Sequence, residues 1–404
     1  MGTSDGDSAM HLEGIRIISF NHFLMGPLGI QFLADLGADV IAIEPIGGAF
    51  QRHWGGANAK KAGGETTLEL VANRNKKSVC LNLKDPAALE VAKKLIENAD
   101  VVTENYRPGV MDKLGLGYDA LKEINPGIIY AAATGFGADG PYVNRPGQDM
   151  IAQSISGMAW INGKVGETPR LIGTSAIDHH GAMVFAGAIL AALVKKGRTD
   201  EGGRVDVNLL SAALNLQAES LVCYFNGEKP ESSQQPTHVG SWYHEAPYGI
   251  YETSDGFIGL SLGQLDTLFD VLGLTGEDKI QQDDAYARRE DVSAIVAEAL
   301  KGQSFDHWAA KFEASKIWYT QINDYEKVAA DPQIDHNQDL VEVESWNGEP
   351  ITLIAHPARY DGQAPPIRLP PQKLGAQTAE VLAELGYASD DIAALVASGA
   401  IALE

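Results

Sequence analysis

The spacing of hydrophobic residues near the start of the chain switches between two periods. Residues 15–20 and 39–43 are short apolar runs of the kind that form buried strands. Between them, the apolar residues of 26–36 recur at helical spacing, and Gly37 suits the end of that helix. A strand, a helix and a second strand in this order predict a βαβ unit.

The alternation of strands and helices continues through the first third of the chain. Asp85 followed by Pro86 provides the cap and the first-turn proline of a helix that we expect to end near Asn98. Further strands are expected at residues 77–83, 100–103 and 128–133. Because strands alternate with helices of similar length, we predict an α/β fold with a parallel, doubly wound sheet.

The pattern changes near residue 225. Residues 227–240 are polar and rich in turn-forming residues, and residues 247–260 predict a β-hairpin that turns at Asp255 and Gly256. Helical spacing then continues to about residue 326. A helix is expected at residues 377–386, followed by a shorter one. These features predict a second, smaller domain after the large one.

A carboxylate stands where a predicted strand gives way to a long apolar helix. The stretch 171–177 suggests a short strand, Asp178 lies at the turn, and residues 182–194 are apolar on every face of a helix. Such a helix is expected to be buried. By its spacing alone, Asp178 is an N-cap that accepts free backbone N–H groups, worth ~1 kcal/mol. Its position at the edge of a core also makes it a candidate for chemistry.

Composition and charge exclude several classes of protein. The 404 residues carry 54 acidic and 31 basic side chains, a formal net charge of −23. General nucleic-acid binding is excluded because it requires basic patches that neutralise phosphates. The two cysteines, Cys80 and Cys223, lie far apart without metal-ligand spacing, so we expect buried thiols in a reducing cytoplasm.

Several sequence signatures are missing. No Gly-x-Gly-x-x-Gly follows the first strand, which speaks against a nicotinamide dehydrogenase. No phosphate-binding loop with Lys-Ser or Lys-Thr and no His-Glu-x-x-His is present, so we expect neither ATP hydrolysis nor a catalytic metal. No apolar stretch reaches membrane-spanning length without polar breaks, and the first residues lack the features of a signal peptide. We therefore expect no membrane association.

A series of short sequence blocks follows one another at characteristic distances along nearly the whole chain. In this order and spacing the chain resembles the class III CoA-transferase family, which includes formyl-CoA transferases, carnitine CoA-transferases and α-methylacyl-CoA racemases. The blocks are Leu12-Glu-Gly-Ile-Arg-Ile-Ile, Leu36-Gly-Ala-Asp-Val-Ile-Ala-Ile-Glu44, Asn75-Lys-Lys-Ser78, Glu104-Asn-Tyr-Arg-Pro-Gly, Thr134-Gly-Phe-Gly, Asp178-x-x-Gly181 and Gly197-Arg-Thr-Asp-Glu-Gly-Gly-Arg.

The resemblance implies a fold and an assembly. The family has a Rossmann-like large domain and a smaller α+β domain, and two chains interlock as a homodimer. The proline-rich residues 365–371 suit a segment that wraps back to the large domain. On this basis the expected parts are a flexible tail, 1–10; the large domain with the catalytic Asp, 11–227; the small domain, 228–330; and a C-terminal segment returning to the large domain, 331–404.

The resemblance also implies a reaction. Asp178 would attack an acyl-CoA, forming an acyl–aspartyl anhydride and then an aspartyl-CoA thioester, from which a carboxylic acid takes the CoA. A carboxylate can attack a thioester when it is held close and partly desolvated. The N-terminus of the helix would stabilise the carboxylate, and nearby backbone N–H groups would stabilise oxyanions. Acyl-CoA is then a substrate, and no tightly bound cofactor is expected.

Candidate CoA contacts follow from the same resemblance. The loop after the first strand contributes His22, Phe23 and Leu24, and the loop at residues 105–106 contributes Asn105 and Tyr106. Lys113 matches a basic residue of the family and would meet phosphate as a point charge. Lys77 and Phe136 complete the set. With Arg74 and Lys76, Lys77 forms the densest basic spot of the chain, which suits either phosphate capture or a strand edge.

Departures from the family pattern bear on the reaction and on the substrate. Gln148 stands where the racemases have a histidine, and an amide cannot accept a proton near neutral pH. Glu252 matches a racemase acid but would lack this partner. His179 and His180 flank the nucleophile, yet the transfer needs no base. Leu24 and Pro45 replace a glutamine and an arginine of the oxalate-linked transferases.

Three functions remain open from the sequence. The first is transfer of CoA from an acyl-CoA to a carboxylic acid larger than formate. The second is an acyl-CoA racemase or isomerase of the same superfamily, and the third is a non-catalytic CoA-binding protein. Asp178 disfavours the third, and Gln148 disfavours the second.

Overall fold

The computed structural model describes residues 10–227, 229–274 and 279–403. Contacts divide the chain into two compact units. The first holds the described residues up to Ala152 together with Ser175–Ala213 and Pro332–Glu404, and the second holds Gln153–Thr174 and Leu214–Asp331. Residues 153–174 and 214–227, which the sequence assigned to the large domain, group with the second unit, because hydrophobic spacing does not reveal which core a helix joins. Of the expected tail, residues 1–9 lie outside the described residues.

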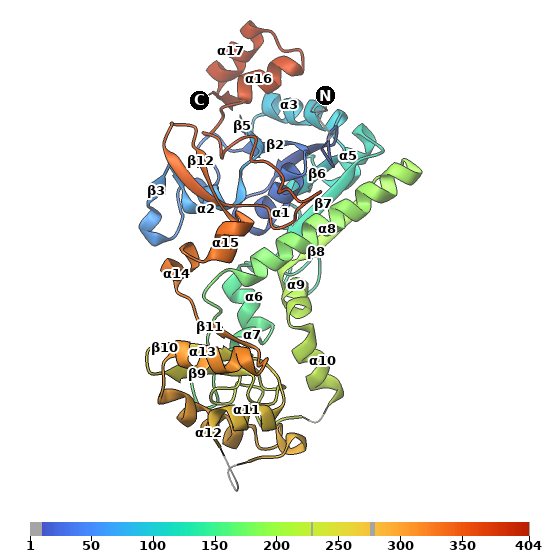
Figure 1. Ribbon diagram of the computed structural model, residues 1–404. Coiled ribbons are helices and arrows are strands. Elements are labelled where there is room, and N and C mark those ends of the chain that lie inside the picture. Colours follow the sequence, from blue (N-terminus) through green and yellow to red (C-terminus); the bar gives the residue numbers. More distant parts are fainter. Residues whose placement is uncertain (1–9, 228, 275–278, 404) are drawn as a thin grey trace. The chain divides into compact units, whose positions relative to one another are not determined.

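A seven-stranded sheet with helices on both faces forms the first unit (Figure 1). Its strand order is β14-β5-β2-β1-β6-β7-β8, and all neighbours pair in parallel except β14 with β5. The strands are β1 (Arg16–Phe20), β2 (Asp39–Glu44), β5 (Lys76–Leu81), β6 (Val101–Glu104), β7 (Ile129–Thr134), β8 (Gly203–Asn208) and β14 (Ile401–Ala402). The strands predicted at residues 15–20, 39–43, 77–83, 100–103 and 128–133 are confirmed. The sequence did not reveal β8, which is largely polar, or β14, which has two residues.

Alternate residues of the central strands face different helices. Ile18 and Phe20 of β1 pack in one core with α3 (Pro86–Glu97), α5 (Tyr118–Ile124) and α16 (Thr378–Glu384). The other face is covered by α1 (Met25–Asp35) and α8 (Ala176–Thr199), which pack closely against each other. A Cβ at Gly29 of α1 would lie 2.8 Å from the carbonyl oxygen of Ala182, so the crossing requires a glycine there.

The long helix α8 differs from its prediction in two ways. No strand precedes it at residues 171–175, and Asp178 lies within its first turn. Only one stripe, including Ile177, Phe185 and Ile189, is buried against the sheet and α1, so the expectation of a helix buried on every face is wrong for the single chain. By length and composition alone α8 would suffice to cross a membrane, with 33% of its most apolar window buried, although core helices pass the same criterion.

The second unit is built on the antiparallel sheet β11-β10-β9. The hairpin predicted at residues 247–260 is confirmed as β9 (Gly249–Thr253) and β10 (Gly256–Leu260). β11 (Tyr319–Gln321) lies where only helical spacing was expected. A hydrophobic core joins this sheet to α11 (Leu265–Leu272), α12 (Arg289–Lys301) and α13 (Phe305–Ala314).

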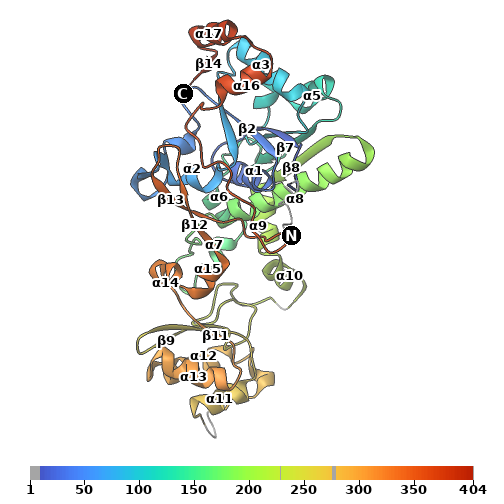
Figure 2. The ribbon, with the colours of Figure 1, turned by 45° about the horizontal axis from the view of Figure 1, so that its top comes forward.

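The C-terminal residues join the first unit. The N–H of Asn75 donates to the carbonyl of Leu369 at 2.7 Å, and the Thr378 hydroxyl accepts from the N–H of Cys80 at 3.0 Å. α16 and α17 (Ser389–Ser398) lie beside α3 in both views (Figure 2).

The remaining elements are η1 (Phe50–Arg52), η2 (Ala57–Ala59), β3 (Lys61–Ala62), β4 (Glu65–Thr66), α2 (Thr67–Ala72), α4 (Val110–Lys113), α6 (Asp149–Ile155), α7 (Met158–Ile161), α9 (Leu209–Leu216), α10 (Ala218–Asn226), η4 (Gln282–Asp284), α14 (Tyr325–Ala329), α15 (Pro332–Asn337), β12 (Leu340–Glu344) and β13 (Pro350–Ile354).

Candidate functional site

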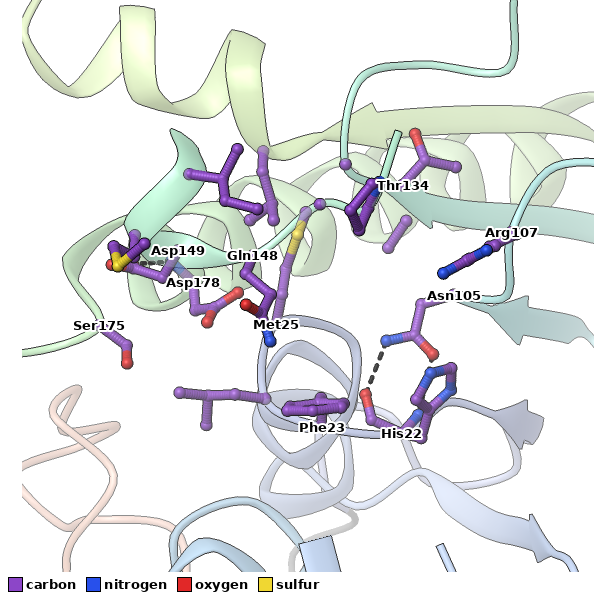
Figure 3. A pocket seen from close by; sticks show the side chains of 18 of the residues that line it. His22, Phe23, Met25, Asn105, Arg107, Thr134, Gln148, Asp149, Ser175 and Asp178 are labelled. Carbon is purple, nitrogen blue, oxygen red and sulfur yellow. Dashed lines mark hydrogen bonds between the residues drawn. The ribbon is translucent and has the colours of Figure 1, made fainter. Parts of the chain in front are cut away.

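A large cavity lies where the strand order of the sheet reverses. From β1 the chain continues to β2 and β5, whereas β6, β7 and β8 follow one another in the other direction. The loops that leave β1 and β6 therefore diverge and open a crevice at the carboxyl ends of the strands, the usual ligand site of such sheets. A cavity of about 760 Å³ occupies this crevice, and all of its lining residues belong to the first unit (Figure 3).

A reciprocal pair of hydrogen bonds ties the two diverging loops together. The N–H of His22 donates to Oδ1 of Asn105 at 2.9 Å, and Nδ2 of Asn105 donates to the carbonyl of His22 at 2.7 Å. The rings of His22 and Tyr106 lie 5.2 Å apart. Burial lowers the pKa of His22, so its imidazole is neutral near pH 7. Its buried Nδ1 has no hydrogen-bond partner within the described chain.

The next two residues of the first loop also face the cavity. Phe23 adopts the left-handed backbone conformation, with φ +66°, and its N–H donates to Oε1 of Gln51 at 3.0 Å. Its ring stacks on that of Phe50, with centroids 4.5 Å apart. Leu24 stands at the start of α1. The structure thus places His22, Phe23, Leu24, Asn105 and Tyr106 together on one cavity wall, where the sequence expected them.

Asp178 is a half-buried carboxylate of the cavity, which Asp149 also lines. Gln148 lines the same cavity, and in the view of Figure 3 Gln148 and Asp178 appear away from His22, Asn105 and Arg107. Burial, and then the negative charge of Asp149, raise the pKa of Asp178 to about 7. A group of this kind changes its charge near neutral pH.

Another carboxylate caps α8. The N-cap residue of this helix is Ser175, which makes no side-chain cap hydrogen bond. Oδ2 of Asp149 instead accepts the backbone N–H groups of Ile177 at 2.7 Å and of Asp178 at 3.1 Å. The interpretation of Asp178 as the N-cap is therefore wrong, and Asp149, which sequence reasoning missed, performs that role from another element.

Three of the candidate CoA contacts lie outside the lining of the cavity. Lys113 is exposed in the last turn of α4. Lys77 is engaged in ion pairs with Asp39 at 3.3 Å and with Glu384 at 3.6 Å. Phe136 makes an edge contact with the ring of Tyr142. Phe136 nevertheless directly follows Thr134 and Gly135, which do line the cavity.

The basic spot at residues 74–77 is internal. The guanidinium of Arg74 pairs with Asp35 at 2.7 Å, and the buried Lys76 ammonium donates to the carbonyl oxygens of Pro27 and Ala72, each at 2.7 Å. Capture of a ligand phosphate by these two side chains is therefore ruled out. The cations that line the cavity are instead Arg107 and Arg145, which sequence reasoning missed. Arg107 directly follows Tyr106, so its block contained the signal.

The remaining candidates differ in their positions. His179 lines a separate cavity of about 550 Å³ on the other side of α1, together with Leu28 and Met183, and its Nδ1 lies 2.8 Å from the carbonyl oxygen of Ser175. His180 lies outside the lining of both cavities. Gln148 lines the cavity of Asp178, and Glu252 lies on β9 of the second unit. Over the described ranges, no group of three or more acidic, histidine or cysteine side chains suited to a metal ion occurs.

Comparison with known proteins gives one consistent result. The family model described as CoA-transferase family III matches residues 12–378. A human succinyl-CoA:glutarate CoA-transferase is 33% identical over 407 residues, which cover 98% of this chain and 91% of the human protein. A succinate–glutarate CoA-transferase of Agrobacterium fabrum is 34% identical over 397 residues, which cover 93% of this chain and 95% of the relative.

A solved structure has the same fold. The crystal structure of a CAIB/BAIF family protein from Brucella suis superposes with a TM-score of 0.82 at 28% sequence identity. The match covers 94% of this chain and all of the Brucella chain.

The raised pKa of Asp178 predicts a dependence of stability on pH. Between about pH 4 and 7 the folded state keeps a proton that the unfolded chain has lost, so the carboxylate lowers the free energy of unfolding as the pH rises. Asp178→Asn removes this penalty. Since one pKa unit corresponds to ~1.4 kcal/mol, we expect the variant to be more stable than the wild type by at least about 1 kcal/mol at pH 8.

The measurement is thermal unfolding of both proteins at pH 8 and at pH 5. The difference in Tm should be largest at pH 8 and should shrink at pH 5, where both side chains are uncharged. An equal difference at the two pH values would contradict the assignment of a raised pKa to Asp178.

Proposed function

The chain belongs to CoA-transferase family III and is an enzyme of that class, and from this premise we propose that Asp178 carries the transfer as a covalent nucleophile. One observation carries the proposal: Asp178 is a partly desolvated carboxylate in the large cavity where the strand order of the sheet reverses. Desolvation removes the water that makes carboxylates poor nucleophiles, and the cavity is large enough to hold the thioester against it.

The proposed reaction has four attacks and needs no proton transfer. The Asp178 carboxylate attacks the donor thioester carbonyl, forming a C–O bond and releasing CoA thiolate. The thiolate then attacks the Asp178 carbonyl of the anhydride, which gives an aspartyl-CoA thioester and free donor carboxylate. The acceptor carboxylate attacks this thioester and releases thiolate again. Finally the thiolate attacks the acceptor carbonyl of the new anhydride, producing acceptor-CoA and restoring the Asp178 carboxylate.

The cavity wall suggests how CoA is held. We assign the pantetheine arm to the aromatic and amide groups of the two tied loops, His22, Phe23, Asn105 and Tyr106. Arg107 suits the CoA phosphates because its guanidinium offers several donors. Lys113, exposed in the same segment, stays a candidate for a phosphate outside the cavity. Phe136 stays a candidate for its edge, whereas the ion pairs of Lys77 argue against a direct contact.

The side chain beside the nucleophile favours transfer over racemisation. A racemase removes a proton from one face of the α-carbon and returns one to the other face, so it needs two acid–base groups. Gln148 lines the cavity where such a partner would act, and its amide does not accept a proton near neutral pH. His179 lines the other cavity. A hydrogen bond from Gln148 to the substrate or to Asp178 is the role we propose for it.

We predict that Asp178→Ala and Asp178→Asn lower the rate of CoA transfer by at least a thousandfold, about 4 kcal/mol of barrier, while the fold is retained. The rate is measured by chromatography of the acyl-CoA product, and the wild-type adduct is identified by mass spectrometry of the acid-quenched peptide that contains Asp178. Asp85→Asn, which changes an exposed helix cap of α3, is the matched control and should transfer at the wild-type rate. An Asp178→Ala variant with more than a tenth of the wild-type rate would show that the nucleophile is another group.

We further propose that the acceptor is a carboxylic acid larger than formate, with dicarboxylic acids of four or five carbons as first candidates. The two relatives compared above are named for succinate and glutarate. Leu24 gives the cavity an apolar surface near its centre, and Arg145 is a lining cation suited to a second carboxylate. Leu24 and Pro45 also replace polar residues of the oxalate-linked enzymes, which disfavours formate and oxalate.

A panel of acceptor acids tests the substrate proposal. With succinyl-CoA as donor, we predict transfer to glutarate at least tenfold faster than to formate or oxalate, a difference of about 1.4 kcal/mol in the barrier. Product CoA esters are quantified by mass spectrometry at equal acceptor concentrations. Rapid exchange between formyl-CoA and oxalate would contradict the proposal.

We also propose that two chains interlock as a cytoplasmic homodimer with a Rossmann-like large domain and a smaller α+β domain. Support comes from large apolar side chains left exposed in the single chain: Val194 of α8 is 55% exposed, and Val222 and Phe225 of α10 are 60% and 72% exposed. Exposed apolar surface of this extent is typical of an interface. The segment 332–404, which returns to the first unit, closes a loop of chain through which a partner can pass.

Light scattering tests the dimer. We predict twice the chain mass of 43.2 kDa at every native concentration, because linked chains cannot separate without unfolding. Dilution to nanomolar concentration should leave the mass unchanged. A monomer under native conditions, or a mass that falls on dilution, would exclude the interlocked form.

A further inference from the structure

One carboxylate connects two segments at the nucleophile. Asp149, the first residue of α6, extends its Oδ2 to the N-terminus of α8, where it accepts the N–H groups of Ile177 and of Asp178 itself. Both carboxylates line the same cavity (Figure 3). The N-cap residue of this helix, Ser175, makes no side-chain cap hydrogen bond of its own. The position of Asp178 therefore depends on a residue 29 positions earlier in the chain.

We propose that Asp149 is the positioning residue of the nucleophile Asp178. It fixes the first turn of α8 and places a negative charge beside Asp178. This charge favours the reaction states in which Asp178 is covalently bound and therefore uncharged. The inference rests on the proposed role of Asp178. The role proposed for Asp149 differs from that of a purely structural cap, because its negative charge has a function in addition to the hydrogen bonds that its oxygen atoms accept.

The first step of the argument concerns the helix N-terminus. A carboxylate in the first turn of a helix is normally stabilised by the free N–H groups and by the helix dipole, which makes it less basic. At α8, the N–H groups of Ile177 and Asp178 are donated to Asp149. The negative charge of Asp149 also offsets the positive end of the dipole. Asp178 is thus deprived of the stabilisation that its location would otherwise supply, and it remains a stronger nucleophile.

The second step follows the charge through the reaction. When Asp178 attacks a thioester, a C–O bond forms, a C–S bond breaks, and the negative charge leaves on the CoA sulfur. The anhydride and the aspartyl-CoA thioester are both neutral at Asp178. Repulsion between Asp149 and Asp178 exists only in the free enzyme, so each covalent state relieves it. Like charges held near each other disfavour ionisation in the same way.

The other charged or titratable groups around the cavity do not duplicate this effect. The loops after β1 and β6 contribute His22, Tyr106 and Arg107, and the segment before α6 contributes Arg145. The cavity-lining residues of α1 and α2 are Met25 and Leu68, which carry no charge. On α8 itself, His179 and His180 follow Asp178 but do not line the cavity. Apart from burial, the influence on the pKa of Asp178 comes from Asp149.

The variant Asp149→Asn separates the two roles. Asparagine keeps a side-chain oxygen and caps helices about as well as aspartate, so the fold should be retained, and at pH 5, where Asp178 is protonated, the thermal unfolding temperature should be nearly unchanged. Without the charge, the acid limb of the pH profile of kcat/KM should move to lower pH by about 1 pH unit. At the same ratio of acyl-CoA to free acid, the trapped fraction of aspartyl-CoA should fall about tenfold, and the plateau rate should fall with it.

The control is the matched cap Asp85→Asn, in which an exposed carboxylate accepts the N–H of Ala87 at 2.8 Å at the start of α3. It should leave the acid limb and the trapped fraction at their wild-type values. If Asp149→Asn does not fold, Asp149→Ser, which also keeps an oxygen acceptor, is measured with the same two readouts.

The outcomes separate this inference from the proposed function. An Asp149 variant with the wild-type acid limb and the wild-type trapped fraction would show that the residue is a structural cap only, and the inference would be overturned. Absence of any aspartyl-CoA adduct in the wild-type enzyme would instead overturn the nucleophile role of Asp178. A shifted limb together with a reduced adduct supports both.

Discussion

β1 and β6 lie side by side in the sheet, but the chain leaves them in opposite directions, and this feature of the topology determines where the cavity of Asp178 opens. Two diverging loops leave a crevice that backbone atoms do not fill. His22 and Asn105 span the crevice with reciprocal hydrogen bonds, which keep its width fixed. The start of α8 adds a carboxylate to the same crevice. The cavity, its aromatic wall and its carboxylate therefore all depend on one reversal of strand order.

The position of Asp178 in this crevice makes the charged form of its side chain unfavourable. Removing a carboxylate from water disfavours its charged form, and a second carboxylate nearby adds to the effect. Asp178 meets both conditions, and its pKa rises to about 7. The ionised form of Asp178 thus lowers the local stability of the fold.

The candidate residues that the structure brings together are those whose position follows from topology. His22, Phe23 and Leu24 come directly after the first strand, and Asn105 and Tyr106 directly after β6, so a parallel sheet brings them together. The α/β class and the central strands were predictable for the same reason: apolar runs and helical spacing are local signals.

The errors concern residues whose environment is set by distant partners. The lysines and the arginine at residues 74–77 resembled a phosphate site. In the structure Asp35 pairs with Arg74, and Asp39 and Glu384 pair with Lys77. Asp35 lies 39 residues before Arg74, so no local sequence pattern reveals this pair. Asp149 caps a helix that begins 27 positions later in the chain, which no cap motif encodes. The exposure of α8 was also unpredictable, because an apolar helix can face either its own core or a partner chain.

A buried ion cluster supports the loop that replaces the glycine-rich turn of dinucleotide-binding folds. Phe23 has a left-handed backbone, which costs on the order of 1 kcal/mol for a residue with a side chain. Gln51 accepts its N–H, and the adjacent Arg52 is buried among Glu44, Glu65 and Glu69, with its Nε 2.6 Å from Glu44.

Burial raises the pKa of Glu65, and raises that of Glu69 to about 8, so the cluster carries fewer than three negative charges around the guanidinium near neutral pH. Because Glu44 ends β2, the cluster anchors Gln51, and through it Phe23, to the sheet. A glycine-rich turn presents bare N–H groups to a pyrophosphate. The loop held in this way presents aromatic and aliphatic side chains instead, which suits the uncharged arm and acyl group of a thioester better than a phosphate.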